Sequence, residues 1–339
     1  MNRVARLSAK DRRQLFAEAG ARRGLPPFHV EKDFWVCWVL GVLFGDADVG
    51  GHLTFRGGTS LSKAWGIIER FSEDIDISMS RPWLGKAKDP AERGIAPAER
   101  ERRLKALRDS CRVMIQTRIH PLLEKAAAET IQDRFRMETE PLEKARDPFC
   151  LHFHYPTTEL AAPLDYNRAA VKIELSGRAD GWPMEPRTIR PYVAEEFPNI
   201  AGPGELTLSC VHPARTFWEK AALVHEHNSR TEAKPLSTAQ ARHLYDLNRL
   251  WNEAAVARTE GFRELFAGVK DHRAAFFAYK WVDYGSLKPS TLRLRPPDDR
   301  LTEWKIDYTR MRPMFFGDPP SFDHLVQGLE TIEKALATL

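Results

Sequence analysis

Two aspartates separated by one residue are the strongest chemical signal in this chain of 339 residues. Asp74 and Asp76 flank Ile75, and a second isoleucine follows, so acidic and apolar side chains alternate as they do on a β-strand. Residues two apart on a strand share a face, which puts both carboxylates on one side and both isoleucines in the core. Like charges this close repel each other unless a cation lies between them. The pattern therefore indicates a divalent metal held by carboxylate oxygens.

A glycine pair precedes the aspartates and predicts a turn into a helix. Residues 53–55 read as the end of a strand, Gly57 and Gly58 permit a tight turn, and the next two hydroxyl residues cap a helix that runs to about Arg70. A helix start offers unpaired N–H groups that suit phosphate oxygens, and hydroxyl groups add further donors. We therefore expect nucleotide phosphates to bind at Gly57, Gly58, Thr59 and Ser60.

Each of these pieces has a simpler interpretation on its own, the glycine pair as a plain turn and the aspartates as an exposed strand face. Their order in the chain favours catalysis, because two metal ions about 3.5 to 4 Å apart can hold a triphosphate and activate an attacking hydroxyl. A P-loop kinase is excluded. Residues 62–64 read Ser-Lys-Ala where that loop needs Gly-Lys followed by Ser or Thr.

Four short motifs resemble those of the AbiEii/AbiGii abortive-infection toxin family, which includes the mycobacterial MenT toxins. They are Gly-Gly-Thr-Ser-Leu-Ser-Lys at 57–63, Phe-Ser-Glu-Asp-Ile-Asp at 71–76, Thr-Phe-Trp-Glu-Lys at 216–220 and Arg-His-Leu-Tyr-Asp-Leu at 242–247. The family belongs to the polymerase-β-like nucleotidyltransferase superfamily, whose pattern is a glycine pair, Asp-x-Asp and a third acidic residue on a later strand. Arg56 departs from the hydrophobic residue that the superfamily prefers there, although a basic residue fits this toxin branch.

The resemblance implies which residues form the site. It asks for a third carboxylate, and Glu174 is the best candidate because it alternates with apolar residues in a predicted strand over 169–175, whereas Asp165 and Asp180 lie in loop-like sequence. It also implies that Lys63 joins the nucleotide-binding residues. The expected catalytic residues are Asp74, Asp76, Glu174, Lys220 and Asp246, of which Asp74, Asp76 and Glu174 also bind Mg²⁺ or Mn²⁺.

Simpler roles stay open for several of these residues. Lys172 shares a strand face with Glu174 and could form a structural, cross-strand ion pair with the neighbours of Glu174. Arg242 and Asp246 are four apart and could pair on one helix. His152 and His154 would face one way and could bind a metal, but polar positions on a half-buried strand explain them equally simply.

The resemblance further implies a toxin of a type IV toxin–antitoxin system. It would transfer a nucleoside monophosphate from an NTP to an RNA, with the 3′ end of tRNA as the expected acceptor, and a cognate antitoxin would be its partner. The same motifs would serve transfer onto a protein. The alternative is a catalytically idle protein that binds nucleic acid or antitoxin on the same fold, although such a scaffold has no need for paired, repelling carboxylates.

The pattern of elements predicts an α+β fold in two domains. A mixed-sheet, polymerase-β-like nucleotidyltransferase domain is expected over residues 1–204, with N-terminal helices and a long helical insertion, and a mainly helical domain that completes the active site over 205–339. The Gly202-Pro203-Gly204 turn marks the boundary. Expected strands are 151–155, 169–175, 187–193 and 205–211; expected helices include 9–23 capped by Ser8, 98–129 broken at Pro121, one capped by Ser237-Thr238, and 322–339 capped by Ser321.

Composition narrows the class of protein. Hydrophobic residues make up 42% of the chain, and no apolar run approaches the roughly 18 residues of a membrane span. The N-terminus leads into a charged helix rather than a signal sequence, so we expect a cytoplasmic protein with no membrane contact. The four cysteines form no Cys-x-x-Cys pair, which argues against a zinc ribbon and a disulfide framework. A net charge of +4 permits an anionic partner without requiring one.

Overall fold

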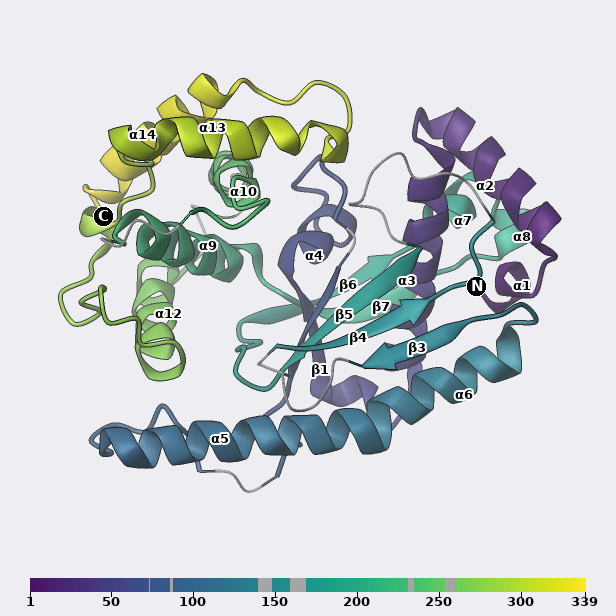
Figure 1. The fold of residues 1–339 in the computed structure, drawn as a ribbon, viewed down its shortest axis with the longest axis horizontal. Helices are drawn as coiled ribbons and strands as arrows, with labels where there is room; N and C mark the ends of the chain where they lie inside the picture. Colours follow the sequence, from purple (N-terminus) through teal and green to yellow (C-terminus); the bar gives the residue numbers. More distant parts are fainter. Residues whose placement is uncertain are drawn as a thin grey trace. The chain divides into compact units, whose positions relative to one another are not determined.

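Seven strands form one mixed sheet in the computed structural model, which describes residues 1–72, 74–85, 88–139, 148–158, 169–230, 235–253, 256 and 260–339 (Figure 1). The strands are β1 (Leu53–Arg56), β2 (Ile75–Met79), β3 (Arg136–Thr139), β4 (Phe149–His154), β5 (Ala170–Ser176), β6 (Met184–Ile189) and β7 (Leu206–Val211). Their order across the sheet is β3-β4-β5-β2-β1-β7-β6. The expected mixed sheet is confirmed: β2 runs antiparallel to β1 and parallel to β5, and β4 runs antiparallel to both β3 and β5.

The central strands have one apolar face and one polar face. Alternate residues such as Phe55, Ile75, Ile77 and Ile173 are at most 1% exposed and form the core. Helix α3 (Pro27–Gly45) packs against this side through its tryptophans, with the rings of Trp35 and Trp38 each within 6 Å of the Phe153 ring. The polar residues of the same strands therefore lie on the opposite face, where chemistry is possible.

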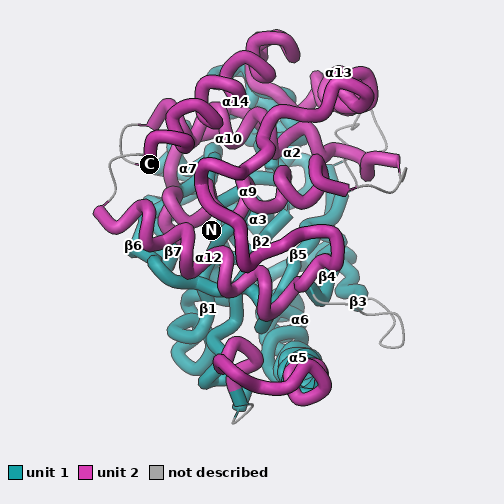
Figure 2. The backbone as a smooth tube through the Cα atoms, turned by 90° about the vertical axis from the view of Figure 1, so that its left-hand side faces the viewer, with its two compact units in different colours: residues 1–64, 72–88, 102–210 teal, residues 65–71, 89–101, 211–339 magenta. Residues whose placement is uncertain are grey.

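The described chain divides into two compact units, coloured separately in Figure 2. Unit 1 comprises residues 1–64, 72–88 and 102–210, and unit 2 comprises residues 65–71, 89–101 and 211–339. The predicted division into a nucleotidyltransferase domain and a helical domain stays a prediction.

Unit 1 contains the sheet and the N-terminal helices. Its helices are α1 (Asn2–Ala5), α2 (Ala9–Arg23), α3, α4 (Gly57–Lys63), α6 (His120–Thr130), α7 (Tyr192–Glu196) and α8 (Pro198–Ala201), together with most of α5 (Pro97–Met114). Ser8 accepts a hydrogen bond from the Asp11 N–H and caps α2 as predicted. A π-helical turn over Ile115–Ile119 separates α5 from α6, so the predicted break lies just before Pro121.

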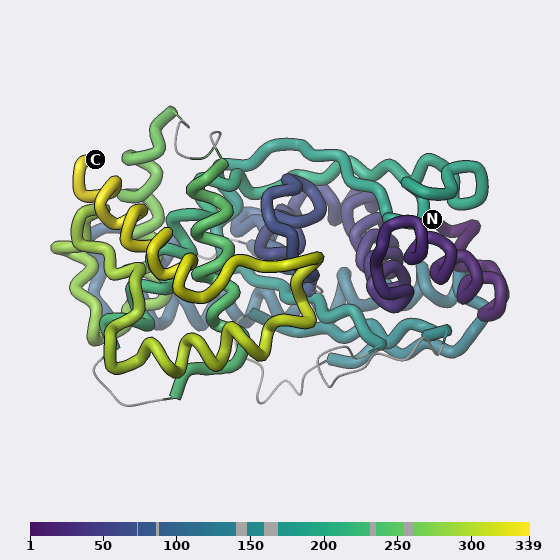
Figure 3. Tube along the Cα trace, turned by 90° about the horizontal axis from the view of Figure 1, so that it is seen from above, coloured from purple at the N-terminus to yellow at the C-terminus, as the bar shows by residue number. Residues whose placement is uncertain are grey.

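Unit 2 is built from helices packed around aromatic side chains. They are α9 (Pro213–Asn228), α10 (Arg242–Asn252), α12 (Phe262–Phe276), α13 (Leu301–Arg310) and α14 (Phe322–Leu336). Helix α9 packs against α10 and α12, and α10 packs against α14, the yellow helix at the C-terminal end in Figure 3. Trp218 is fully buried on α9 and donates its indole N–H to the Phe262 carbonyl at 2.7 Å.

Two predictions about helix ends were wrong. The helix after the glycine pair begins at Gly57 itself and ends at Lys63 rather than near Arg70. Gly66 leaves helical conformation with φ +65°, and residues 67–71 then exchange hydrogen bonds with distant parts of unit 2 instead of their own helix. Helix α10 carries no side-chain cap, because the Asp307 carboxylate accepts from the Ala239 and Ala241 N–H groups in place of Ser237 or Thr238.

The strand expected over 187–193 was wrong in its second half, because β6 ends at Ile189 and α7 begins at Tyr192. The cap expected for the last helix is confirmed. Ser321 caps α14 by accepting from the His324 N–H. All four cysteines are free and buried. Within the described residues, no helix is both long enough and apolar enough to cross a membrane.

Candidate functional site

The three predicted carboxylates lie on neighbouring strands of unit 1. Asp76 on β2 is the register partner of Glu174 on the parallel strand β5, so both side chains leave the sheet on its polar face. Asp74 stands two residues earlier and directly precedes β2. On the other side, Arg56 at the end of β1 is the register partner of Asp76. The alternation that predicted a shared face for Asp76 and Glu174 is therefore present in the sheet, while Asp165 lies outside the described residues and Asp180 lies in a loop after β5.

A lysine ammonium lies among these carboxylates. Lys172 is two residues before Glu174 on β5 and forms a short ion pair with it. Burial alone would lower the pKa of Lys172, but the hydrogen bond and charge of Glu174 and the charge of Asp74 outweigh burial and raise it. The sequence suggested a cross-strand pair with the neighbours of Glu174, whereas the ion pair in the structure is with Glu174 itself, on the same strand. Lys172 thus supplies positive charge beside the carboxylates.

The carboxylates have the donor chemistry for a metal but are not gathered around one point. Carboxylate oxygens are the ligands that Mg²⁺ and Mn²⁺ prefer. Among the residues that the structure describes, no three His, Cys, Asp or Glu side chains are arranged to hold a metal ion. His154 instead pairs with Glu138 at 2.8 Å and its ring stacks with that of His152. Metal binding at Asp74, Asp76 and Glu174 would therefore require the Lys172 ammonium to move away from Glu174.

Gly57 makes room for the Asp76 carboxylate. Its φ of +75° is one that residues with a side chain rarely adopt, and a Cβ placed there would come within 2.6 Å of the carboxyl carbon of Asp76. The glycine is thus required twice, for the turn into α4 and for the approach of β2. Gly57 and Gly58 are both partly exposed, so their backbone can reach a ligand.

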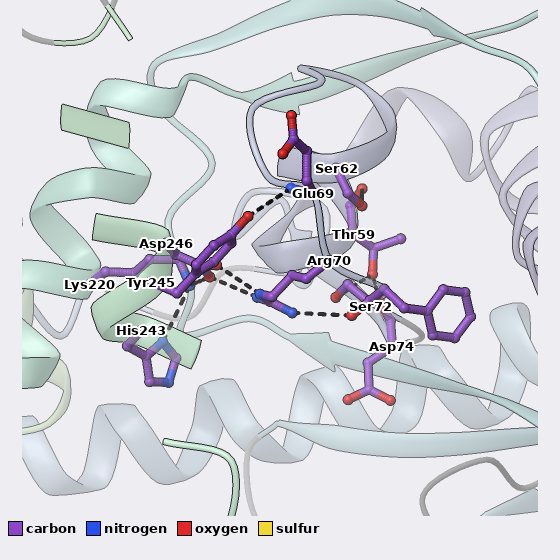
Figure 4. Close-up of polar contacts among 11 residues, drawn as sticks. Thr59, Ser62, Glu69, Arg70, Ser72, Asp74, Lys220, His243, Tyr245 and Asp246 are labelled. Carbon is purple, nitrogen blue, oxygen red and sulfur yellow. Dashed lines mark hydrogen bonds and ion pairs between the residues drawn. The ribbon is translucent and has the colours of Figure 1, made fainter. Parts of the chain in front are cut away.

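The hydroxyls of Thr59 and Ser60 point into unit 1 rather than outward. Thr59 is 3% exposed, and its hydroxyl bonds to the Ser72 hydroxyl at 3.0 Å and to the Asp74 carbonyl (Figure 4). Ser60 is 2% exposed, and its hydroxyl is buried as well. Thr59 therefore fixes the backbone that carries Asp74, which is a positioning role that the sequence did not suggest.

Lys63 belongs to a buried cluster with Asp33 and Tyr192. Its ammonium lies 2.8 Å from Asp33 and 3.6 Å from the centre of the Tyr192 ring, and its side chain is 6% exposed. Burial would lower the pKa of Lys63, but the charge of Asp33 raises it to about 12. The Tyr192 N–H also donates to Asp33, at 2.6 Å. The structure thus places Lys63 with Asp33 on α3, not with the carboxylates of β2 and β5.

Lys220 and Asp246 meet within unit 2. The Lys220 ammonium lies 2.8 Å from Asp246, whose side chain is fully buried, and 3.3 Å from Nδ1 of His243 (Figure 4). Burial would raise the pKa of Asp246, yet its two cationic neighbours hold it well below the usual range. Burial also lowers the pKa of His243, with help from the Lys220 charge, so the ring is neutral and accepts from the ammonium.

The second cation on Asp246 is Arg70, which sequence reasoning missed. Its guanidinium binds both carboxylate oxygens, with distances of 2.8 and 2.7 Å (Figure 4). The simpler pairing of Asp246 with Arg242, four residues away on α10, is not the one seen, since the hydrogen bonds to Asp246 come from Arg70 and Lys220. One signal was available: Arg70 immediately precedes the Phe-Ser-Glu-Asp-Ile-Asp motif, and a buried aspartate needs a counter-ion.

A comparison with known protein families identifies the family of this chain. The family described as "Nucleotidyl transferase AbiEii toxin, Type IV TA system" matches residues 39–332, which include every residue of the candidate site. No curated protein matches the chain at a significant level. The match spans most of the 339 residues and both units of the structure. The chain belongs to the AbiEii nucleotidyl transferase toxin family of type IV toxin–antitoxin systems.

Proposed function

We propose that this chain is a metal-dependent enzyme that transfers a nucleoside monophosphate from an NTP to an RNA acceptor. The observation that carries the proposal is the placement of Asp76 and Glu174 as register partners on the polar face of the sheet, with Asp74 two residues away and Gly57 against the Asp76 carboxylate. Three carboxylates beside a glycine turn are what this reaction class requires.

Asp74, Asp76 and Glu174 would hold Mg²⁺ or Mn²⁺. The bound metal would polarise the transferred phosphoryl group and the attacking hydroxyl. The chain's own residues supply the frame: β2 and β5 set the spacing of the carboxylates, Thr59 fixes the Asp74 backbone, and Lys172 compensates their charge before metal binds.

The nucleotide would bind next to the glycine pair. Gly57 and Gly58 are partly exposed and offer backbone close to Asp76, whereas the Thr59 hydroxyl is bonded to the Asp74 carbonyl and the Ser60 hydroxyl is buried. We therefore assign phosphate contact to the two glycines and a supporting role to the two hydroxyl residues. Lys63 supports α4 through Asp33. Lys220 would balance the charge of the departing pyrophosphate, with Asp246 orienting it.

The acceptor and the partner follow from the family. A type IV toxin–antitoxin system implies a cognate antitoxin, and we propose RNA, with the 3′ end of tRNA first, as the acceptor. The second candidate is a catalytically idle protein on the same fold. The Lys172–Glu174 ion pair favours it in one respect, since it stabilises the carboxylates without metal.

One experiment separates the two candidates. The purified chain is incubated with each of the four labelled NTPs, Mg²⁺, and either total cellular RNA or total protein, beside Asp76→Asn. We expect label in one acceptor class from one preferred NTP, and none with the variant, because the substitution removes a metal ligand without a core contact. Equal labelling by the variant, or none by the parent with any NTP, contradicts the proposal.

A further inference from the structure

Two cationic side chains contact the Asp246 carboxylate, although one would be enough to neutralise its charge. Arg70 forms a two-point pair with its carboxylate, the strongest geometry available to an arginine. The Lys220 ammonium reaches the Oδ2 atom as well, at 2.8 Å. The net charge of this cluster, formed by Arg70, Asp246 and Lys220, is therefore one positive unit.

This excess charge is buried. The side chains of Arg70 and Asp246 are 2% and 0% exposed, and that of Lys220 is 10% exposed. The charges that act on Lys220 are one negative, from Asp246, and two positive, from Arg70 and Arg242. A buried charge without a partner is unfavourable, so the cluster is stabilised when an anion approaches Lys220. Of these three side chains, that of Lys220 has the largest exposed fraction.

We infer that Arg70 is the resident counter-ion of Asp246, and that this pairing leaves Lys220 available for a polyphosphate ligand. The inference rests on the proposed nucleotide-binding function and names Arg70 as a positioning residue for it. Without Arg70, the Asp246 carboxylate would be left with Lys220 as its bonded cation among the described residues, and the two charges would neutralise each other.

Arg249 provides a matched control. It lies on the same helix as Asp246 and ties it to the same segment as Arg70, donating to the Ile67 carbonyl at 3.0 Å and to Glu69 at 3.2 Å. It makes no hydrogen bond to Asp246. Loss of Arg249 removes a comparable tether while leaving the charges on Asp246 unchanged.

Calorimetric binding of inorganic triphosphate to the full chain, in EDTA to exclude metal, tests the inference. We expect Arg70→Met to weaken binding at least tenfold, Lys220→Met to abolish it, and both Arg70→Lys and Arg249→Met to stay within about threefold of the parent. The double variant Arg70→Met/Asp246→Asn restores the excess charge on Lys220, so we expect it to bind more tightly than Arg70→Met alone.

Three results overturn the inference: no triphosphate binding by the parent, parental affinity in Arg70→Met, or a double variant no better than Arg70→Met. Thermal unfolding confirms that each variant is folded. If Arg70→Met does not fold, the double variant decides by itself, since retained affinity supports the charge argument and lost affinity contradicts it. A parent that binds triphosphate in this pattern but transfers no nucleotide would leave the inference standing and overturn the proposed function.

Discussion

The position of the Asp76 carboxylate depends on the absence of a side chain at Gly57. Gly57→Ala would place a methyl group against the carboxyl carbon of Asp76 and impose a side chain at φ +75°, a strain of about 1 to 2 kcal/mol. We expect transfer to slow by roughly 100-fold, as a misplacement of about 1 Å can cause. Measuring transfer rate and melting temperature together separates displacement from unfolding.

Gly24→Ala is the control for this prediction. Gly24 has a similar φ of +65°, but nothing lies within 4 Å of its Cβ position. It should lose some stability and keep full activity. If both variants lose activity alike, backbone strain explains the result and the contact with Asp76 does not.

Lys172 makes a second prediction at the scale of single residues. Lys172→Met removes the cation that compensates Glu174 and Asp74. Because the pair is partly exposed, we expect the metal-free protein to lose about 1 kcal/mol, or roughly 1 to 2 °C in melting temperature. Added Mn²⁺ should then raise the melting temperature more than it does in the parent, since the ion no longer displaces an ammonium.

Arg136→Met serves as the control, because Arg136 forms an exposed ion pair with Glu138 on β3 of the same sheet, at 3.2 Å. The Mn²⁺-induced rise in that variant should match the parent. An equal rise in the Lys172 variant and the parent would mean that Lys172 does not compete with metal.

Sequence patterns predicted those site residues whose positions depend on neighbours in the chain. Asp76 and Glu174 share a face because strands alternate, and the same period identified β4, β5 and β7. Partners far apart in the chain could not be found this way. Asp246 and Arg70 are 176 residues apart, and nothing in either segment alone specifies their pairing. The ion pair between Lys63 and Asp33 likewise joins residues of two different helices.

At the scale of elements, the same distinction explains the helix after the glycine pair. Residues 64–70 contain no strong local breaker except Gly66, so the sequence predicted a longer helix. In the structure, the Phe71 N–H donates to the Met314 carbonyl and the Glu69 carbonyl accepts from Phe316. Tertiary hydrogen bonds replace helical ones in this segment, and helix propensity, which depends on local sequence, cannot predict them.

His225, in the last turns of α9, should make the stability of the protein depend on pH. The His225 ring accepts the Arg293 N–H at Nδ1, at 3.0 Å, and burial, aided by the Arg293 charge, lowers its pKa to about 4. The unfolded chain binds the proton more readily, near pH 6.5, so the stability from neutral His225 is complete above that pH and is lost as pH falls towards 4.

His225→Gln keeps an acceptor for Arg293 and removes the titration. We expect the free energy of unfolding of the parent to fall between pH 7 and pH 4 by up to about 3 kcal/mol more than that of the variant, measured by urea denaturation. His324→Gln, at an exposed position on α14, should follow the parent. Parallel curves for His225→Gln and the parent would contradict the assignment.

At the scale of the whole molecule, the family match and the sheet support the same reaction class from independent directions. The match covers residues 39–332 as a sequence, while the register of β2 and β5 is a property of the fold. The two compact units each contain one group of predicted site residues, carboxylates in unit 1 and the Lys220 cluster in unit 2. The family match and the sheet both support our proposal that the chain transfers a nucleoside monophosphate.

The position of the transferred phosphorus tests that claim most directly. The preferred NTP is supplied in parallel reactions with its label on the α- or on the γ-phosphate, together with Mg²⁺ and the acceptor, and both the macromolecule and the released pyrophosphate are counted. Nucleotidyl transfer predicts that the macromolecule gains the α label only and that the γ label leaves as pyrophosphate. Gain of the γ label by the macromolecule, or release of pyrophosphate without a labelled acceptor, would contradict it.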